Sequence, residues 1–225
     1  MPYRARYVAR PQPSRPLTPR SSPSIRGEFS SGKPGMGFRR VAYRGLPARH
    51  LMALLEEDDN VVAYQEAPAS FRWSDGRKIR TCYPTAAARL TDGRLICLLL
   101  NRSQRSFPEC DPAYAHSVRQ AAAKAGYDAV EIWTETEIKA GNRLANALLV
   151  GHARCVDADQ MHLHAVRTAI DRLGGKASIR DLRISCGLGN QAFRAIIKLI
   201  AMRELKPINA NDILDDFAVV QIPRS

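Results

Sequence analysis

The sequence of 225 residues contains no apolar run as long as the roughly 18 residues that a membrane-spanning helix requires. It has no CxxC pair either. Its five cysteines are odd in number and far apart, which disfavours both a disulfide framework and a zinc site. The N-terminus lacks the apolar stretch of a secretory signal. These absences predict a cytoplasmic protein in a reducing compartment, without a membrane partner.

Acidic residues are scarce relative to basic ones. The chain has 22 Asp and Glu against 34 Lys and Arg, so its formal net charge is +12 at pH 7. Residues 1–50 carry +10 of this charge, residues 51–159 carry −2 and residues 160–225 carry +4. A basic excess of this size indicates a polyanionic partner, and double-stranded DNA is the expected one.

Residues 1–36 contain seven prolines together with many Arg and Ser, and show no hydrophobic periodicity. Such a segment cannot offset the entropy of its ordering by burying apolar surface. We expect a disordered basic arm over residues 1–36 that lies along DNA phosphates and makes binding depend on salt. A solubilising tail or a plain linker is the alternative interpretation.

Residues 37–157 alternate between helical and strand-like patterns. Asp-Gly pairs are hairpin signals, and the apolar run 95–100 predicts a strand buried on both faces. Helices are expected at 46–55, 113–125 and 136–150, and strands at 61–64, 69–73, 78–83, 86–90, 94–100 and 130–133. This order predicts an α+β domain with a mixed sheet flanked by helices.

Residues 158–225 follow a different, mainly helical pattern. Helices are expected at 161–173, 178–186 and 191–204, and a strand at 217–222. Ser178, three residues before Asp181, is typical of a capping box, and Asn190 is expected to cap the third helix. With a tight Gly187-Leu188-Gly189 turn between the last two helices, the pattern predicts a winged helix-turn-helix.

The third of these helices has an apolar and a polar face. Its core-facing residues are expected to be Phe193, Ile196, Ile197 and Ile200, while Gln191, Arg194 and Lys198 face outward at spacings suited to a major groove. The residues expected to contact DNA are Arg39, Arg40, Ser178, Arg180, Asn190, Gln191, Arg194 and Lys198. The alternatives are a solvated face without a ligand and a surface that binds another protein.

Four segments between residues 46 and 150 resemble one known family. They are LEEDDNVVAYQEAP (55–68), DGRKIRTCYPTAAARL (75–90), DGRLICLLLN (92–101) and VEIWTETEIKAGNRLANALL (130–149). In order and spacing they are similar to the N-terminal nuclease domain of TnsA-type transposon endonucleases, which have the PD-(D/E)xK restriction-endonuclease-like fold. That family also carries a C-terminal helical DNA-binding domain, as expected here for residues 158–225.

The chemistry of that family is missing from this chain. The resemblance implies Mg²⁺ held by a helix Glu, the Asp of P-D and the acid of E-x-K, with the Lys acting on the attacking water. The matching positions hold Ala48, Thr85, Leu99 and Asn101, and residues 76–91 and 93–108 contain no Asp or Glu. We therefore expect a nuclease fold without nuclease activity, metal or cofactor, in which Leu99 has become a core residue.

Two other polar groups are interpreted as structural. The acidic run from Glu56 to Asp59 is expected to be a solvated turn at a helix end, not a metal cluster. His162 and His164, two residues apart on a helix, point in different directions and are not expected to share a ligand.

These observations lead to three functional hypotheses. The first is a DNA-binding protein without catalysis, a nucleoid-associated transcriptional regulator of a mobile element, phage or related bacterial system. The second is a DNA-binding or DNA-cleaving subunit of a TnsA-like transposition machine. The third is a module that binds RNA polymerase or a transposition protein. A homodimer is compatible with each of them.

Overall fold

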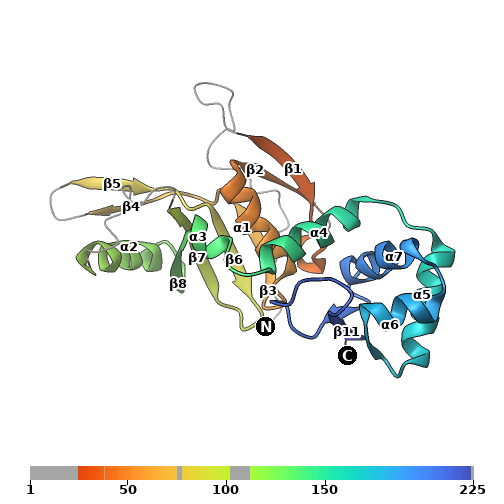
Figure 1. The fold of residues 1–225 in the computed structure, drawn as a ribbon. Helices are drawn as coiled ribbons and strands as arrows, with labels where there is room; N and C mark the ends of the chain where they lie inside the picture. Colours follow the sequence, from red (N-terminus) through yellow and green to blue (C-terminus); the bar gives the residue numbers. More distant parts are fainter. Residues whose placement is uncertain (1–24, 38, 75–77, 102–111, 224–225) are drawn as a thin grey trace, which may run out of the picture. The chain divides into compact units, whose positions relative to one another are not determined.

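The computed structural model describes residues 25–37, 39–74, 78–101 and 112–223, and the chain divides into two compact units, Met1–Ile138 and Lys139–Ser225 (Figure 1). We call them unit 1 and unit 2. Helices accompany a mixed sheet, so the predicted α+β class is confirmed. Within the described ranges, no helix is both long and apolar enough to cross a membrane.

Unit 1 is built on a four-stranded sheet. Its strands run in the order β3-β6-β7-β8, with antiparallel pairing except between β7 and β8, which are parallel. The bounds are β3 Val61–Glu66, β6 Ala86–Leu90, β7 Leu95–Asn101 and β8 Ala129–Thr134. From Ile96 onward every residue of β7 is buried, which confirms the predicted strand with two covered faces.

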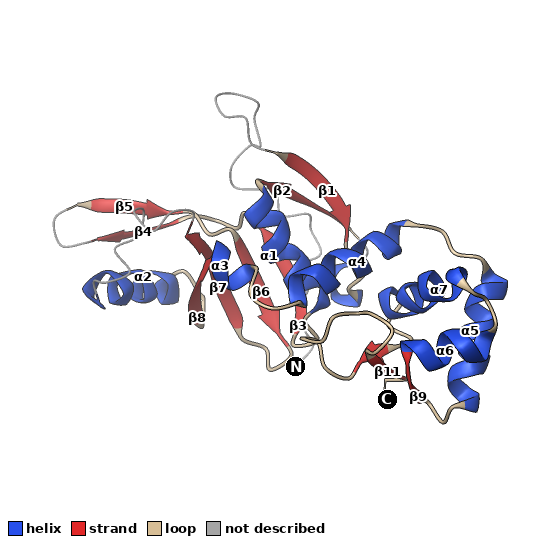
Figure 2. Ribbon diagram, in the orientation of Figure 1, coloured by secondary structure: helices blue, strands red, loops and turns tan. Residues whose placement is uncertain are grey.

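Helices and a hairpin flank this sheet (Figure 2). Helix α2 provides the crossover that a parallel β7–β8 pair requires, and it packs against the hairpin β4–β5. The bounds are α1 Leu46–Glu57, β4 Phe71–Ser74, β5 Ile79–Cys82, α2 Pro112–Lys124 and α3 Glu135–Ile138. The predicted turn at 74–76 lies mainly outside the described residues.

The expectation of a disordered arm over residues 1–36 is wrong for its second part. Strand β1 (Arg26–Ser30) pairs with β2 (Arg40–Arg44), and the short helix η1 (Pro34–Met36) lies between them. Residues 1–24 are outside the described part of the chain. Half of the +10 charge of residues 1–50 therefore belongs to structured residues, because residues 1–24 contribute five Arg and no acid.

The order of this segment comes from polar contacts with the end of α1. The Glu56 carboxylate accepts hydrogen bonds from the Ser31 hydroxyl (2.8 Å) and the Gly32 N–H (2.7 Å). The ammonium of Lys33, a buried residue, donates to the Asp58 carbonyl (2.7 Å). These partners lie about 25 positions apart in the sequence, so hydrophobic periodicity could not reveal them.

The same contacts correct the interpretation of the acidic run. Glu56 is only 2% exposed and also accepts a hydrogen bond from the Tyr64 hydroxyl (2.7 Å), so it is not part of a solvated turn. Burial, and then the neighbouring Glu56 carboxylate, raise the pKa of Tyr64 well above its usual value. Glu56 is thus a structural residue that accepts hydrogen bonds from Ser31, Gly32 and Tyr64.

Unit 2 combines helices with a small antiparallel sheet in the order β10-β11-β9. Its helices are α4 Arg143–Cys155, α5 Gln160–Arg172, α6 Ile179–Cys186 and α7 Asn190–Ala201. Its strands are β9 Lys176–Ser178, β10 Lys206–Pro207 and β11 Val219–Gln221. Side chains of all four helices meet in one apolar core.

The sequence placed the domain boundary after residue 157, but the two units divide at Ile138 and Lys139. The helix expected at 136–150 is interrupted: α3 ends at Ile138, and α4 begins at Arg143, after Gly141 with φ +64°. Helix α4 packs against α7, and Val150 belongs to the core of unit 2. This packing assigns α4 to the C-terminal unit.

The ends of α6 and α7 show one correct and one incorrect capping prediction. The Ser178 hydroxyl accepts a hydrogen bond from the Asp181 N–H (3.0 Å), as expected for the start of α6. Helix α7, however, has Gly189 as its N-cap residue. Asn190 is the first residue of the helix, and its side chain does not cap the helix. The helix also ends at Ala201 instead of 204.

Candidate functional site

The N-terminal half of α7 presents three polar side chains to solvent. Asn190, Gln191 and Arg194 are exposed, and within the described part of the chain none of these side chains has a hydrogen-bonding or ionic partner. The turn before them contains Gly187 and Gly189, both with positive φ (+66° and +54°), which lets the chain reverse sharply between α6 and α7. A cation and two amides are therefore held on one rigid helix end and are available to a ligand.

Behind these polar side chains, α7 is anchored in the core. Ile196, Ile197 and Ile200 are buried, as predicted. Phe193 is only half-buried and packs at the edge of the core, so its predicted place is correct in part. The exposed face of α7 is consequently limited to its N-terminal half.

Lys198 does not face outward as the sequence predicts. Its ammonium donates hydrogen bonds to the carbonyls of Ala153 (3.1 Å), Arg154 (3.1 Å) and Val156 (2.7 Å), at the C-terminal end of α4. The Ala153 carbonyl also accepts from the Val156 N–H (3.3 Å). The last carbonyls of a helix generally lack intrahelical partners, and a cation is favourable at this end. Lys198 thus holds α4 over the C-terminal half of α7.

Helix α6 contributes one free cation. The Arg180 side chain is exposed and has no partner among the described residues, while its backbone N–H donates to the Asp216 carbonyl (2.9 Å). The Ser178 hydroxyl, by contrast, is engaged in the cap and also donates to the Asp181 carboxylate (2.6 Å). Of the two residues predicted on this element, Arg180 is available to a ligand.

Arg39 and Arg40 lie in unit 1. The Arg39 guanidinium forms an ion pair with Glu66, whose Oε1 accepts from Nη1 at 2.8 Å, and also donates to the Tyr64 carbonyl (3.1 Å). Arg40 is exposed and lies 3.7 Å from the Glu28 carboxylate. Arg39 is therefore a structural residue, whereas Arg40 remains accessible.

The segment between β10 and β11, where a wing is expected, is tied to α4. The Asn146 amide donates to the carbonyls of Ala210 (3.2 Å) and Asp212 (2.7 Å), and its oxygen accepts from the Leu214 N–H (3.1 Å). Residues 208–218 contain three acids and no Lys or Arg. Sequence reasoning missed the role of Asn146. Asn142, four residues earlier, donates to the Asn211 carbonyl. This spacing of four places both amides on one helix face and is the signal that could have indicated their shared role.

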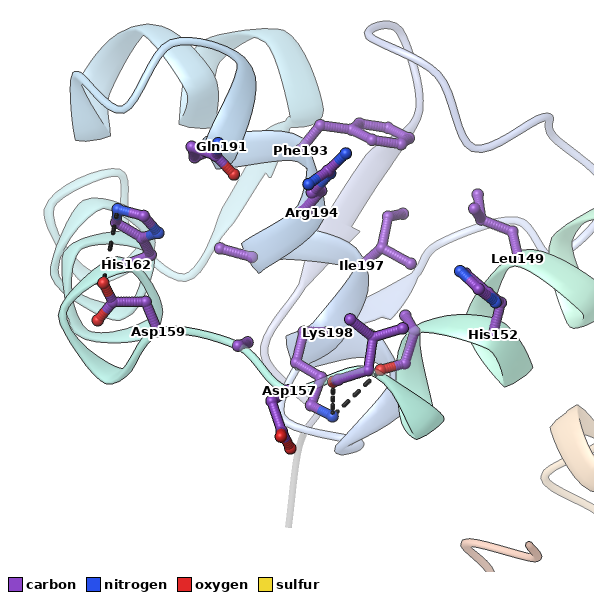
Figure 3. Close-up of a pocket in the computed structure, with 14 residues that line it drawn as sticks. Leu149, His152, Asp157, Asp159, His162, Gln191, Phe193, Arg194, Ile197 and Lys198 are labelled. Carbon is purple, nitrogen blue, oxygen red and sulfur yellow. Dashed lines mark hydrogen bonds and ion pairs between the residues drawn. The ribbon is translucent and has the colours of Figure 1, made fainter. Parts of the chain in front are cut away.

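A pocket of about 630 Å³ lies between α4, residues 156–159, the start of α5 and α7 (Figure 3). Arg194 and Phe193 lie next to each other on one side of it, and Lys198 lies at the opposite end beside Asp157. His162 lines the pocket and lies 4.0 Å from the Asp159 carboxylate, which also accepts from the Met161 N–H (2.8 Å). His164 is exposed and does not line the pocket.

The four positions that match the nuclease motif form no polar centre. Leu99 is 2% exposed and belongs to an apolar cluster with Phe71, Trp73, Cys82, Cys97, Val118 and Ala122, so the expectation of a core residue is confirmed. The Thr85 N–H donates to the Leu98 carbonyl (2.8 Å), and Ala48 and Asn101 are buried. In the described part of the chain, no three His, Cys, Asp or Glu side chains are grouped closely enough to hold a metal ion.

Comparison with known proteins adds no relative to this picture: no protein-family model matches the chain, and no curated protein matches it in sequence.

Proposed function

We propose that the protein binds double-stranded DNA through the N-terminal half of α7 and has no nuclease activity of its own. The proposal is carried by the exposed side chains of Asn190, Gln191 and Arg194, joined by Arg180 on α6, which have no partner among the described residues. Arginine and amide side chains are the groups that pair with base edges in a major groove, and the N-terminal residues of such a helix make these contacts.

The architecture of unit 2 supports the same proposal. The order α5-β9-α6-α7-β10-β11, with a three-stranded antiparallel sheet, fits a winged helix-turn-helix. Its wing would differ from a phosphate-binding one, since residues 208–218 are acidic and held by Asn146. The backbone contacts would instead come from Arg180 and from the basic residues 1–24.

In unit 1, the apolar surroundings of Leu99 support a nuclease-like fold without its reaction. The mixed sheet flanked by helices suits the resemblance to TnsA-type endonucleases, and Leu99 occupies the place of an acid that Mg²⁺ would need. We assign to unit 1 the role of a platform for DNA docking or dimerisation. The whole protein would act as a cytoplasmic, nucleoid-associated transcriptional regulator of a mobile element, phage or related bacterial system.

DNA binding is tested by genomic footprinting, followed by fluorescence anisotropy on the recovered sequence. Arg194→Ala should weaken binding to that sequence by about 5- to 150-fold and relax the preference for it, since a bidentate arginine–guanine pair contributes about 1–3 kcal/mol. Arg172→Ala, which removes one exposed arginine at the end of α5, is the matched control and should change affinity little. Equal effects of the two substitutions would contradict the proposal.

The same footprint separates the regulator from a second candidate, a subunit of a TnsA-like transposition machine. This candidate is favoured by the mixed sheet flanked by helices and by the presence of a second, mainly helical unit. Sites at promoters support the regulator, whereas sites at transposon ends support the transposition subunit. Nicking of supercoiled DNA that requires Mg²⁺ or Mn²⁺ and stops with EDTA would overturn the inactive nuclease.

A further inference from the structure

The pocket of unit 2 has the dimensions and the walls of a small-molecule site. Its volume of about 630 Å³ falls within the range of roughly 300–1,000 Å³ that ligand pockets occupy. Leu149, Ala153, Ile197 and Phe193 supply apolar surface from two facing helices, α4 and α7. A few polar groups converge on this surface, which is the usual composition of a site that orients one ligand.

Among these polar groups, Arg194 is the cation that can bind a ligand. The other lysine or arginine of the lining is Lys198, and the three carbonyls of α4 and Val156 already take the three N–H donors of its ammonium. Arg194 is exposed and has no partner in the described part of the chain. A guanidinium presents two parallel N–H donors, a geometry that suits a carboxylate or a phosphate.

The acids of the pocket are placed away from this cation. Asp157 and Asp159 belong to the segment 156–159 that forms the rim near Lys198 and His162 (Figure 3). Asp159 caps α5 and lies near His162. The remaining polar groups of the lining are Gln191 and His152, whose side chains carry hydrogen-bond donors.

We propose that this pocket binds a small organic anion, with its carboxylate or phosphate group on Arg194 and an apolar ring against Phe193, Ile197 and Leu149. The binding goes beyond DNA recognition and does not depend on it. Its consequence does rest on the proposed function. Arg194 is shared, so a bound anion masks the central DNA-contacting side chain and makes the DNA affinity respond to a metabolite of this class.

The test uses three probes with one ring system and different head groups: 1-naphthoate, 1-naphthyl phosphate and the neutral 1-naphthamide. Isothermal titration calorimetry on the full chain without DNA should show saturable binding of at least one of the two anions, with a dissociation constant below about 1 mM. The amide should bind at least tenfold more weakly, because it forms no charge-assisted pair with the guanidinium. The preferred anion tells whether the site takes carboxylates or phosphates.

Substitutions place the binding in the pocket. Arg194→Ala should weaken anion binding by tenfold or more. Arg194→Lys should retain only part of the affinity, since an ammonium lacks the paired donors of a guanidinium. Arg172→Ala, outside the pocket, should bind as the wild type does. Absence of binding by both anions, equal binding of the amide, or unchanged binding by Arg194→Ala would each overturn the proposal.

The outcome is separable from that of the DNA experiment. If the protein binds DNA but neither anion, only the pocket proposal is overturned. If it binds an anion but no DNA, only the proposed function is overturned. When both bind, a saturating anion should lower the DNA affinity of the wild type. DNA affinity unaffected by the bound anion would contradict the shared role of Arg194.

Discussion

The ammonium of Lys198 donates a hydrogen bond to the carbonyl of Val156, 2.7 Å away, and so joins the middle of α7 to the end of α4. This contact changes which part of α7 a ligand can reach. The outward polar positions lie in the N-terminal half of α7, and the space beside α4 forms the pocket that Arg194 lines. Because Lys198 is paired with α4, α7 is not exposed along its whole length. Only its polar N-terminal end is exposed, and this end borders a cavity.

Lys198→Met should lower stability without weakening DNA binding. The substitution keeps the aliphatic chain and removes the donor to three carbonyls, so we expect a loss of about 1–2 kcal/mol in the free energy of unfolding. Urea denaturation measures this loss, and anisotropy should show a change in DNA affinity of less than about twofold. Lys176→Met, at an exposed position of β9, is the control. Normal stability combined with a large loss of DNA affinity would show that Lys198 contacts the DNA.

Removal of residues 1–24 should weaken DNA binding in the same proportion for all sequences. The deletion takes away five arginines and no acid and leaves β1 intact. The slope of log K against log salt should fall by about 1 for each arginine that contacts a phosphate. A variant of full length with the five arginines changed to glutamine should reproduce the effect. An unchanged slope would show that these residues do not touch DNA.

Glu56→Ala should destabilise unit 1 strongly. The substitution leaves the Ser31 hydroxyl, the Gly32 N–H and the Tyr64 hydroxyl without their acceptor in a buried site. We expect a loss of about 3 kcal/mol or more in the free energy of unfolding, together with faster proteolysis of residues 25–36. Asp59→Ala, at an exposed position of the same acidic run, should cost less than about 1 kcal/mol. Equal effects of the two substitutions would support the original interpretation of Glu56 as part of a solvated turn.

The strands of unit 1 could be predicted because their signals are local. Strand β6 is predicted at 86–90 and occupies Ala86–Leu90, and the apolar run after Gly93 gives the buried strand β7. The break between α3 and α4 was missed, because an isolated glycine such as Gly141 is tolerated within many helical patterns. The ordered segment from Arg26 to Arg44 was missed because its anchors are distant residues at the end of α1.

The candidate site was predictable to a similar extent. The glycine turn and the polar N-terminal half of α7 locate Gln191 and Arg194 without knowledge of tertiary structure. The positions of Lys198 and Arg39 could not be obtained this way, since each pairs with an element placed by tertiary packing: α4 for the first, and the β3 residue Glu66 for the second. A helical face counted from sequence alone cannot show which neighbouring helix covers it.

Cysteine labelling tests whether the face of the sheet that carries Leu99 is closed. Cys82 and Cys97 lie in the same apolar cluster as Leu99, and burial raises the pKa of Cys82 to about 11 and that of Cys97 to about 12. The thiolate is the reactive form, so at pH 8 iodoacetamide should label the exposed Cys155 in the native protein and spare both buried thiols. Peptide mass spectrometry reads the labelled sites, and the same reaction in denaturant should label all three.

A rise from pH 8 to pH 9 should still leave Cys82 and Cys97 unlabelled in the native protein, because both of their pKa values stay above the working pH. Native labelling of Cys97 at the rate of Cys155 would mean that water reaches the strand β7 beside Leu99. That face would then have room for a metal ion and its water ligands, and an apolar core would no longer support the proposal that the protein has no nuclease activity.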